Sequence, residues 1–162
     1  MRLLTIPAAA VLALSGTAAL AKTSHEGWPK INGDLKRHTN DESGTLRATK
    51  LRKHNELLGG HGSDTIYAGP WGDVIWGDYK PSGQPTTQRD RIRGGAGRDF
   101  IYAGHGWNSI NAGPGNDWIK AHFGRGTIDC GPGVDALYVS RRARKHYTIR
   151  GCERISHKTL GY

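Results

Sequence analysis

The sequence predicts an all-β fold, a parallel β-solenoid of nine-residue repeats with an N-terminal and a C-terminal cap. Three observations predict it: a nine-residue period over 59–138, turn residues in the first six places of each unit, and strand residues in the last three. In register, the units read GGHGSDTIY, AGPWGDVIW, GDYKPSGQPTTQRDRIR, GGAGRDFIY, AGHGWNSIN, AGPGNDWIK, AHFGRGTID and CGPGVDALY. The third unit is the same phrase with eight inserted residues.

Each unit combines a tight turn with a short strand. Glycine recurs at the first, second and fourth places, where it allows turns that a Cβ would prevent. The closing triplets, such as Phe100-Ile101-Tyr102, alternate as strands do and send the middle side chain to one face. The predicted inward row is Ile66, Ile75, Ile92, Ile101, Ile110, Ile119, Ile128 and Leu137. This core is thin for a glycine-rich chain, so a further interaction is expected to hold the turns.

The repeat resembles the hemolysin-type calcium-binding nonapeptide of the RTX family, whose pattern is G-G-x-G-x-D-x-U-x with U a large aliphatic residue. The resemblance implies a parallel β-roll in which two units make one coil. It also implies calcium between turns stacked on the same edge, held by the sixth-place Asp and by backbone carbonyls. The expected function is that of a secreted, non-catalytic calcium-binding repeat protein in which calcium orders the turns along one edge.

Alternate units stack on the same edge, so the sixth places divide into two columns. One reads Asn55, Asp73, Asp99, Asp117 and Asp135, and the other reads Asp64, Asp90, Asn108 and Gly126. Stacked carboxylates repel one another unless a cation lies between them, and calcium takes six to eight oxygen ligands. We therefore expect calcium ions between successive Asp residues of the first column, with the fourth-place glycines Gly97, Gly115 and Gly133 in the same sites. Asp99/Asp117 and Asp117/Asp135 are the best sites, because Trp71 replaces the fourth-place glycine before Asp73.

A solenoid without metal is the alternative. Asp in a tight turn accepts hydrogen bonds from backbone N–H groups without any ion. The chain also has a formal charge of +9, whereas RTX repeats are usually acidic, and Arg98 beside Asp99 repels cations. That charge suggests an anionic polysaccharide or cell-surface polymer as a neighbour, or solubility alone.

The segments around the repeats have distinct compositions. Residues 1–21 read as a signal peptide, with Arg2, an apolar run and an A-x-A cleavage site, so we expect an extracellular protein. Residues 22–49 form a polar N-terminal arm and cap with a first strand at Thr45-Leu46-Arg47. The β-roll spans 50–138 and carries a surface loop at 78–89 that is a possible recognition loop. Residues 139–162 form a basic C-terminal cap with a last strand at Tyr147-Thr148-Ile149.

Two cysteines in an exported chain predict one disulfide, Cys130 to Cys152, which ties the tail to the last repeat. One sheet is predicted to present an aromatic outer face. Its members are Trp76, Phe100, Tyr102, Trp118 and Tyr138. Such a face binds sugar rings or a partner protein, or else the N-terminal arm or the tail covers it.

No catalytic motif is present. The chain has no G-x-S-x-G and no H-E-x-x-H, and its eight histidines are scattered. The acidic residues belong to turns and are not paired across a cleft. We therefore expect no enzyme activity. The alternative to the calcium-binding function is an extracellular module that binds polysaccharide or a cell surface through the aromatic face.

Overall fold

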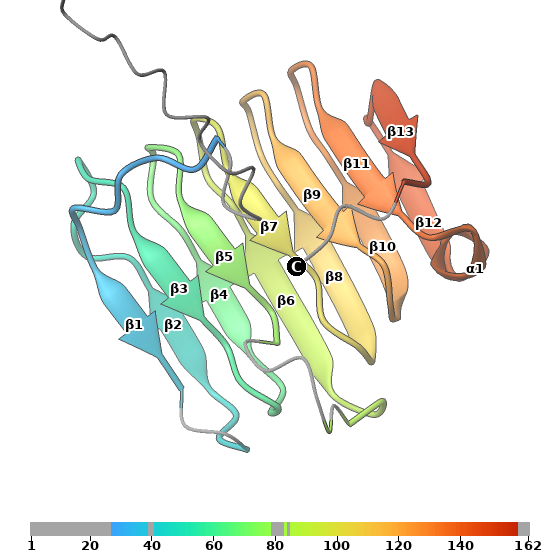
Figure 1. Cartoon of the computed structure of the whole chain (residues 1–162). Coiled ribbons are helices and arrows are strands. Elements are labelled where there is room, and N and C mark those ends of the chain that lie inside the picture. Colours follow the sequence, from blue (N-terminus) through green and yellow to red (C-terminus); the bar gives the residue numbers. More distant parts are fainter. Residues whose placement is uncertain (1–26, 39–40, 79–82, 84, 159–162) are drawn as a thin grey trace, which may run out of the picture.

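In the computed structural model, the chain forms two parallel β-sheets wound into one solenoid (Figure 1). The structure describes residues 27–38, 41–78, 83 and 85–158. The predicted signal peptide, the start of the N-terminal arm, part of the insertion and the last four residues lie outside the described residues.

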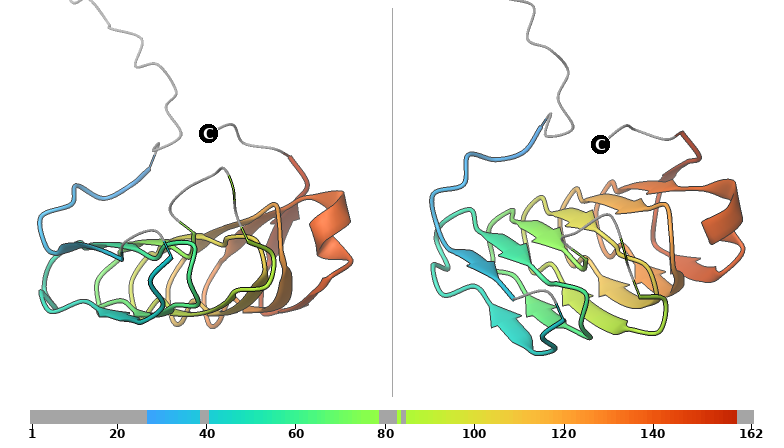
Figure 2. Two further views of the ribbon diagram at one scale, coloured as in Figure 1. Left: turned by 90° about the horizontal axis from the view of Figure 1, so that it is seen from below. Right: turned by 60° about the horizontal axis from the view of Figure 1, so that its bottom comes forward.

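The first sheet has seven strands and the second has six, and strand numbers alternate between the two sheets. The first sheet contains β1 (Leu35–Arg37), β3 (Glu56–Leu58), β5 (Val74–Trp76), β7 (Phe100–Tyr102), β9 (Trp118–Ala121), β11 (Ala136–Val139) and β13 (Arg154–Ser156). The second contains β2 (Thr45–Arg47), β4 (Thr65–Tyr67), β6 (Arg89–Arg93), β8 (Trp107–Asn111), β10 (Arg125–Asp129) and β12 (Tyr147–Arg150). Each coil therefore gives one strand to each sheet, as predicted, and the two sheets lie as facing layers (Figure 2).

The core lies between the two layers. All eight residues of the predicted inward row are buried. Strand register stacks Ile66, Ile92, Ile110 and Ile128 in one sheet and Ile75, Ile101, Ile119 and Leu137 in the other. An Ile or Leu occupies the same inward position in every coil, so successive coils pack against one another in the same way.

The sheets extend beyond the predicted β-roll at both ends. The predicted strands at Thr45–Arg47 and Tyr147–Ile149 are present, and β1 and β13 add strands that the sequence analysis missed. Both missed strands pair with the outermost strand of the repeat region, β1 with β3 and β13 with β11. Each follows a turn with a single glycine, Gly33 or Gly151, in place of the glycine pattern of the repeat, so the nine-residue period does not mark them.

The predicted disulfide between Cys130 and Cys152 is present and ties the C-terminal cap to the last repeat. The C-terminal cap also contains α1 (Arg141–Arg144). Ser140 caps this helix, and its hydroxyl oxygen accepts the Ala143 N–H at 3.1 Å. No helix in the described ranges combines the length and the apolarity that crossing a bilayer requires.

Candidate metal centre

The sixth-place side chains of the first sheet's edge form a continuous hydrogen-bonded column. Each backbone N–H in the column donates to the side-chain oxygen of the next member, over N to O distances of 2.6–2.8 Å. The members are Asp34, Asn55, Asp73, Asp99, Asp117, Asp135 and Glu153. We call this set the Asp column. Residues 18 to 26 positions apart in the sequence thus become direct neighbours, as the predicted coil requires.

The ends of the column were missed by sequence analysis. Asp34 precedes the predicted repeats, and Glu153 follows them in a cap without a glycine pattern. A signal for Glu153 was available, because it lies 18 residues after Asp135; in the structure its Oε2 accepts the Asp135 N–H at 2.8 Å. Spacing alone therefore indicates another coil where the glycines no longer do.

Three carboxylates in the column each leave one oxygen without a partner. Oδ2 of Asp99, Asp117 and Asp135 is buried and accepts no hydrogen bond in the described structure. Burial raises the pKa of Asp99 to about 9 and that of Asp117 to about 7, and it also raises the pKa of Asp135. The charges of neighbouring column members raise these pKa values further, against the effect of the backbone N–H bonds. Ionised carboxylates in this column therefore need a nearby cation.

Asp73 differs from Asp99, Asp117 and Asp135 in that both of its carboxylate oxygens accept hydrogen bonds. Its Oδ1 accepts from the backbone N–H and the side-chain amide of Asn55, and its Oδ2 accepts from the Gly69 N–H at 2.7 Å. Both of its oxygens are engaged without an ion. Trp71, at the fourth place of this turn, points into solvent and packs beside His54 with ring centroids 5.6 Å apart. The structure therefore brings Asp73 into the column but leaves it the weakest of the predicted ligands.

The fourth-place glycines bring carbonyl oxygens next to these carboxylates. A Cβ on Gly115 would strike the Gly97 carbonyl and lie 3.0 Å from Asp117 Oδ1. A Cβ on Gly133 would likewise strike the Gly115 carbonyl and lie 3.3 Å from Asp135 Oδ1. A shallow groove over these turns is lined by the three glycines with Arg98, Asn116 and Pro132. The Gly97 and Gly115 carbonyls therefore lie beside the Oδ1 atoms of Asp117 and Asp135, and calcium prefers carbonyl and carboxylate oxygens as ligands.

No three His, Cys, Asp or Glu side chains gather as a ligand set within the described ranges. An ion between two column members would therefore depend on backbone carbonyls for its remaining ligands. Arg98 lines the same groove, and its positive charge would repel a bound cation. Its guanidinium lies 4.9 Å from the Phe100 ring centroid, on the outer face of the sheet. The donor set fits a hard oxygen-seeking cation at Asp99/Asp117 and Asp117/Asp135.

The second edge is built differently. Asp64 N–H donates to Asp90 Oδ1 at 2.9 Å, and His38 Nδ1 lies 2.6 Å from Asp64 Oδ1. Asn108 takes the next place and donates to the carbonyls of Gly104 and His105 and to the Tyr147 hydroxyl. The amide Asn108 and the glycine Gly126 follow Asp90 at the positions where the other edge continues with carboxylates, so this column lacks the repeated acid pairs.

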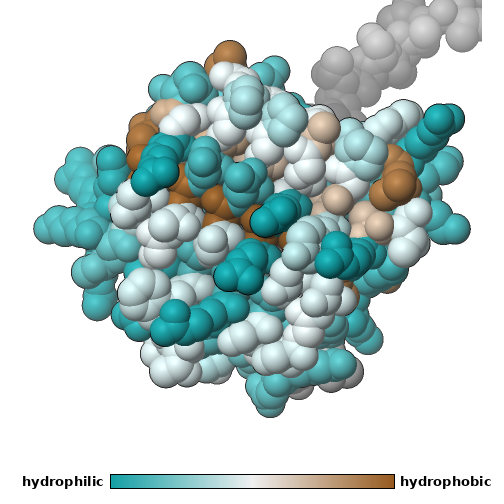
Figure 3. All heavy atoms as spheres, turned by 180° about the vertical axis from the view of Figure 1, so that it is seen from behind, coloured by the Kyte–Doolittle hydropathy of each residue, from teal (hydrophilic) through white to brown (hydrophobic). Residues whose placement is uncertain are grey.

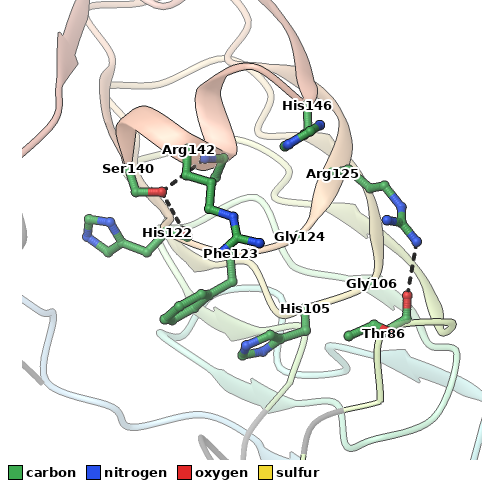
Figure 4. Close-up of a pocket in the computed structure, with 11 residues that line it drawn as sticks. Thr86, His105, Gly106, His122, Phe123, Gly124, Arg125, Ser140, Arg142 and His146 are labelled. Carbon is green, nitrogen blue, oxygen red and sulfur yellow. Dashed lines mark hydrogen bonds between the residues drawn. The ribbon is translucent and has the colours of Figure 1, made fainter.

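The second edge also holds a pocket of about 540 Å³, shown in Figure 4. Basic and aromatic side chains line it: Arg125, Arg142, His105, His122, His146 and Phe123. No acidic residue is among its described lining residues. The Ser140 hydroxyl donates to the His122 carbonyl at 2.7 Å and caps α1, so it is committed to structure. Sequence reasoning missed this pocket, because its walls come from three coils and the tail.

The predicted aromatic face exists, and the N-terminal arm covers part of it. Trp76 and Tyr102 stack with ring centroids 4.0 Å apart, and Tyr102, Trp118 and Tyr138 continue the row. Trp28 from the arm packs edge-on against Trp76 and Tyr102, and its indole N–H donates to the Tyr102 hydroxyl at 2.9 Å. Phe100 and Tyr102 are buried, and the other three members are partly buried. The N-terminal arm therefore covers the centre of the aromatic face, as the alternative to a ligand-binding face predicted.

Comparison with known proteins agrees with this geometry. Residues 52–75 and 86–119 match the RTX calcium-binding nonapeptide repeat, in four copies. No curated protein and no solved structure matches the chain. The matched residues include Asn55, Asp73, Asp99 and Asp117 of the Asp column.

Proposed function

Because residues 52–75 and 86–119 of this β-solenoid match the RTX calcium-binding nonapeptide repeat, we propose that calcium binds along the Asp column and completes the fold. The observation that carries the proposal is the set of buried, unpartnered Oδ2 atoms on Asp99, Asp117 and Asp135. Calcium would supply a positive charge in direct contact with these carboxylates, in addition to the more distant charges of Arg98 and Arg154. The proposed ligands are Asp99 with Asp117, Asp117 with Asp135, and the carbonyls near Gly97, Gly115 and Gly133.

The proposed role of the ion is structural. The solenoid has a narrow core and stacks its turns through glycines, so much of its stability must come from the edges. Without a cation, the column either ionises and repels itself or takes up protons at a cost set by the pH. A ligand that binds the folded chain and not the unfolded chain raises the free energy of unfolding. We therefore propose a secreted, non-catalytic repeat protein that becomes fully ordered where calcium is abundant.

Calorimetric titration of the purified chain with calcium, after treatment with EDTA, tests the proposal. We expect saturable binding, together with a higher melting temperature in circular dichroism. Asp117 belongs to both of the best sites, so Asp117→Asn should reduce the number of bound ions. Asp90→Asn is the matched control, since Asp90 is a buried carboxylate of the second edge whose Oδ2 also lacks a partner. The neighbouring Asp64 Oδ2 accepts the Gly60 N–H, so within the described residues Asp90 has no second unpartnered carboxylate beside it and the variant should leave the stoichiometry unchanged.

Unchanged melting and no heat of binding in calcium would leave a metal-free Asp ladder as the correct description. Equal losses in both variants would place the ions elsewhere. If Asp117→Asn binds as many calcium ions as the wild type, the assignment of ligands is also contradicted.

A further inference from the structure

The outer face of the second sheet carries a concentration of arginines. Outward positions alternate with core positions along each strand, and arginine fills six of them, all exposed to solvent. They are Arg47, Arg89, Arg91, Arg93, Arg125 and Arg150, which we call the arginine face. Figure 3 views the molecule from the side opposite to Figure 1, and hydrophilic side chains spread across that side. The aromatic face and the arginine face therefore lie on opposite sides of the solenoid.

Two aromatic rings on this face are each held between two guanidinium groups. Tyr67 has the Cζ of Arg47 at 3.8 Å and that of Arg93 at 5.7 Å from its ring centroid. Register explains this sandwich, because β4 lies between β2 and β6 and these three residues share one row. Rings stacked in this way hold long arginine side chains in place and reduce the entropy lost when they bind.

The second sandwich repeats the arrangement two strands further along. Trp107 on β8 has the Cζ of Arg89 at 5.4 Å and that of Arg125 at 5.0 Å from its ring centroid. Arg125 also donates to the Thr86 carbonyl at 3.3 Å and lines the pocket of Figure 4. The cationic surface therefore continues around the second edge toward Arg142.

The arginine face has little opposing charge. The ion pairs in the described structure join Asp34, Asp64 and Asp41 to Lys36, His38 and His61, and include none of the six arginines. Among the outward positions of the second sheet's strands, Asp129 is the one acidic residue. Unpaired guanidinium forks on a flat surface are suited to carboxylate or sulfate groups, which they bind through two parallel hydrogen bonds.

The spacing of the forks suits an extended polymer. Adjacent strands lie about 4.8 Å apart, so Arg47 and Arg93, two strands apart, repeat at roughly 10 Å. Along β6, Arg89, Arg91 and Arg93 occur at every second residue, or roughly 6.6 Å apart. The result is a two-dimensional grid of positive charges that borders the pocket of Figure 4 at Arg125. Such a grid contacts several charged units of one chain at once.

We propose that the arginine face binds an acidic polysaccharide through its carboxylate or sulfate groups. Single-stranded nucleic acid fits less well, because base stacking needs open ring faces and both faces of Tyr67 and Trp107 are taken by guanidinium groups. The inference concerns the sheet opposite to the aromatic face and does not rest on the proposed calcium sites.

Binding is measured by calorimetry or retention in calcium buffer, on the full chain, with three probes: polygalacturonate for carboxylate, dextran sulfate for sulfate and neutral dextran. We expect binding to one or both acidic polymers and none to neutral dextran. The double variant Arg47→Gln with Arg93→Gln removes one sandwich and should weaken binding by roughly tenfold. Arg47→Lys with Arg93→Lys keeps the charge but loses the planar forks, and should weaken binding by about threefold.

Arg52→Gln with Arg144→Gln is the matched control, since it removes the same charge from exposed residues elsewhere. It should leave the affinity within about twofold of the wild type. Equal weakening in the control and test pairs would reduce the effect to overall charge and overturn the proposal. Absence of binding to both acidic polymers, or tighter binding to a single-stranded oligonucleotide, would overturn it as well. If the glutamine pair lowers the melting temperature, the lysine pair carries the test, and wild-type affinity in that pair contradicts the proposal.

Discussion

At the scale of single residues, aspartate and glycine divide the work of each turn. Asp117 uses Oδ1 to accept the N–H of Asp99 one coil away, and its Oδ2 is left without a protein partner. Gly115 lets the Gly97 carbonyl approach so closely that no side chain fits between the two turns. The repeat therefore needs both residue types at fixed places, one for the oxygen ligands and one for the close approach.

The close approach at Gly115 can be tested directly. Gly115→Ala places a methyl group against the Gly97 carbonyl oxygen, a backbone atom that cannot move without separating two coils. We expect the free energy of unfolding to fall by about 2–3 kcal/mol, measured by urea denaturation in calcium buffer.

Gly83→Ala provides the comparison, because an added Cβ at Gly83 meets nothing within 4 Å. Its backbone has φ +71°, so a loss of about 1 kcal/mol is expected from conformation alone. A Gly115→Ala protein as stable as Gly83→Ala would show that the stacked turns separate easily.

At the scale of elements, the two edges of the solenoid have different chemistry although both are built from the same repeat. The first edge keeps four successive carboxylates from Asp73 to Asp135, and the second replaces them after Asp90 with Asn108 and Gly126. Asn108 bonds to Tyr147 of the tail, so protein groups of the C-terminal cap take the place of an ion there. The last coil is then closed by α1, β12, β13 and the disulfide.

The disulfide should stabilise this closing element. Replacing both cysteines, Cys130→Ser with Cys152→Ser, releases a tail that is tied to the last repeat across 22 residues. We expect the free energy of unfolding to fall by about 3 kcal/mol on the chain-entropy account, with lower melting temperature in circular dichroism. The wild type treated with a reducing agent should behave in the same way.

Calcium stoichiometry serves as the control for the disulfide prediction. The sites at Asp99/Asp117 and Asp117/Asp135 do not include the cysteines, so the serine variant should keep its ions at low temperature. A serine variant that melts with the wild type would mean that β13 and its ladder to β11 hold the tail without the covalent bond.

At the scale of the whole molecule, buried acids couple the stability of the solenoid to pH. Burial raises the pKa of Asp90 to about 8 and that of Asp78 to about 6, well above the value of about 4 in an unfolded chain. Between the pKa of an Asp in the unfolded chain, about 4, and the raised pKa values in the folded chain, the folded chain holds more protons than the unfolded chain. The free energy of unfolding should therefore fall as pH rises from about 4 to about 8.

Asp90→Asn isolates this effect. The wild type should lose more stability than Asp90→Asn between pH 5 and pH 8, by about 1–3 kcal/mol, when both are unfolded in urea at saturating calcium. Asp41→Asn, at an exposed carboxylate, should follow the wild type. Parallel curves for wild type and Asp90→Asn would show that Asp90 is already ionised in the folded chain.

The sequence was sufficient for the repeat, the inward row from Ile66 to Leu137, the pairing of sheets and the cysteine bridge. Those features follow from a local period, because identical units must stack in the same way once the chain coils. Tertiary contact alone decided the outer strand β1, the column end Asp34, and the covering of Tyr102 by Trp28. It also decided which carboxylate oxygens are left unpartnered. These features depend on groups that meet across coils outside the nine-residue pattern, so the repeat does not predict them.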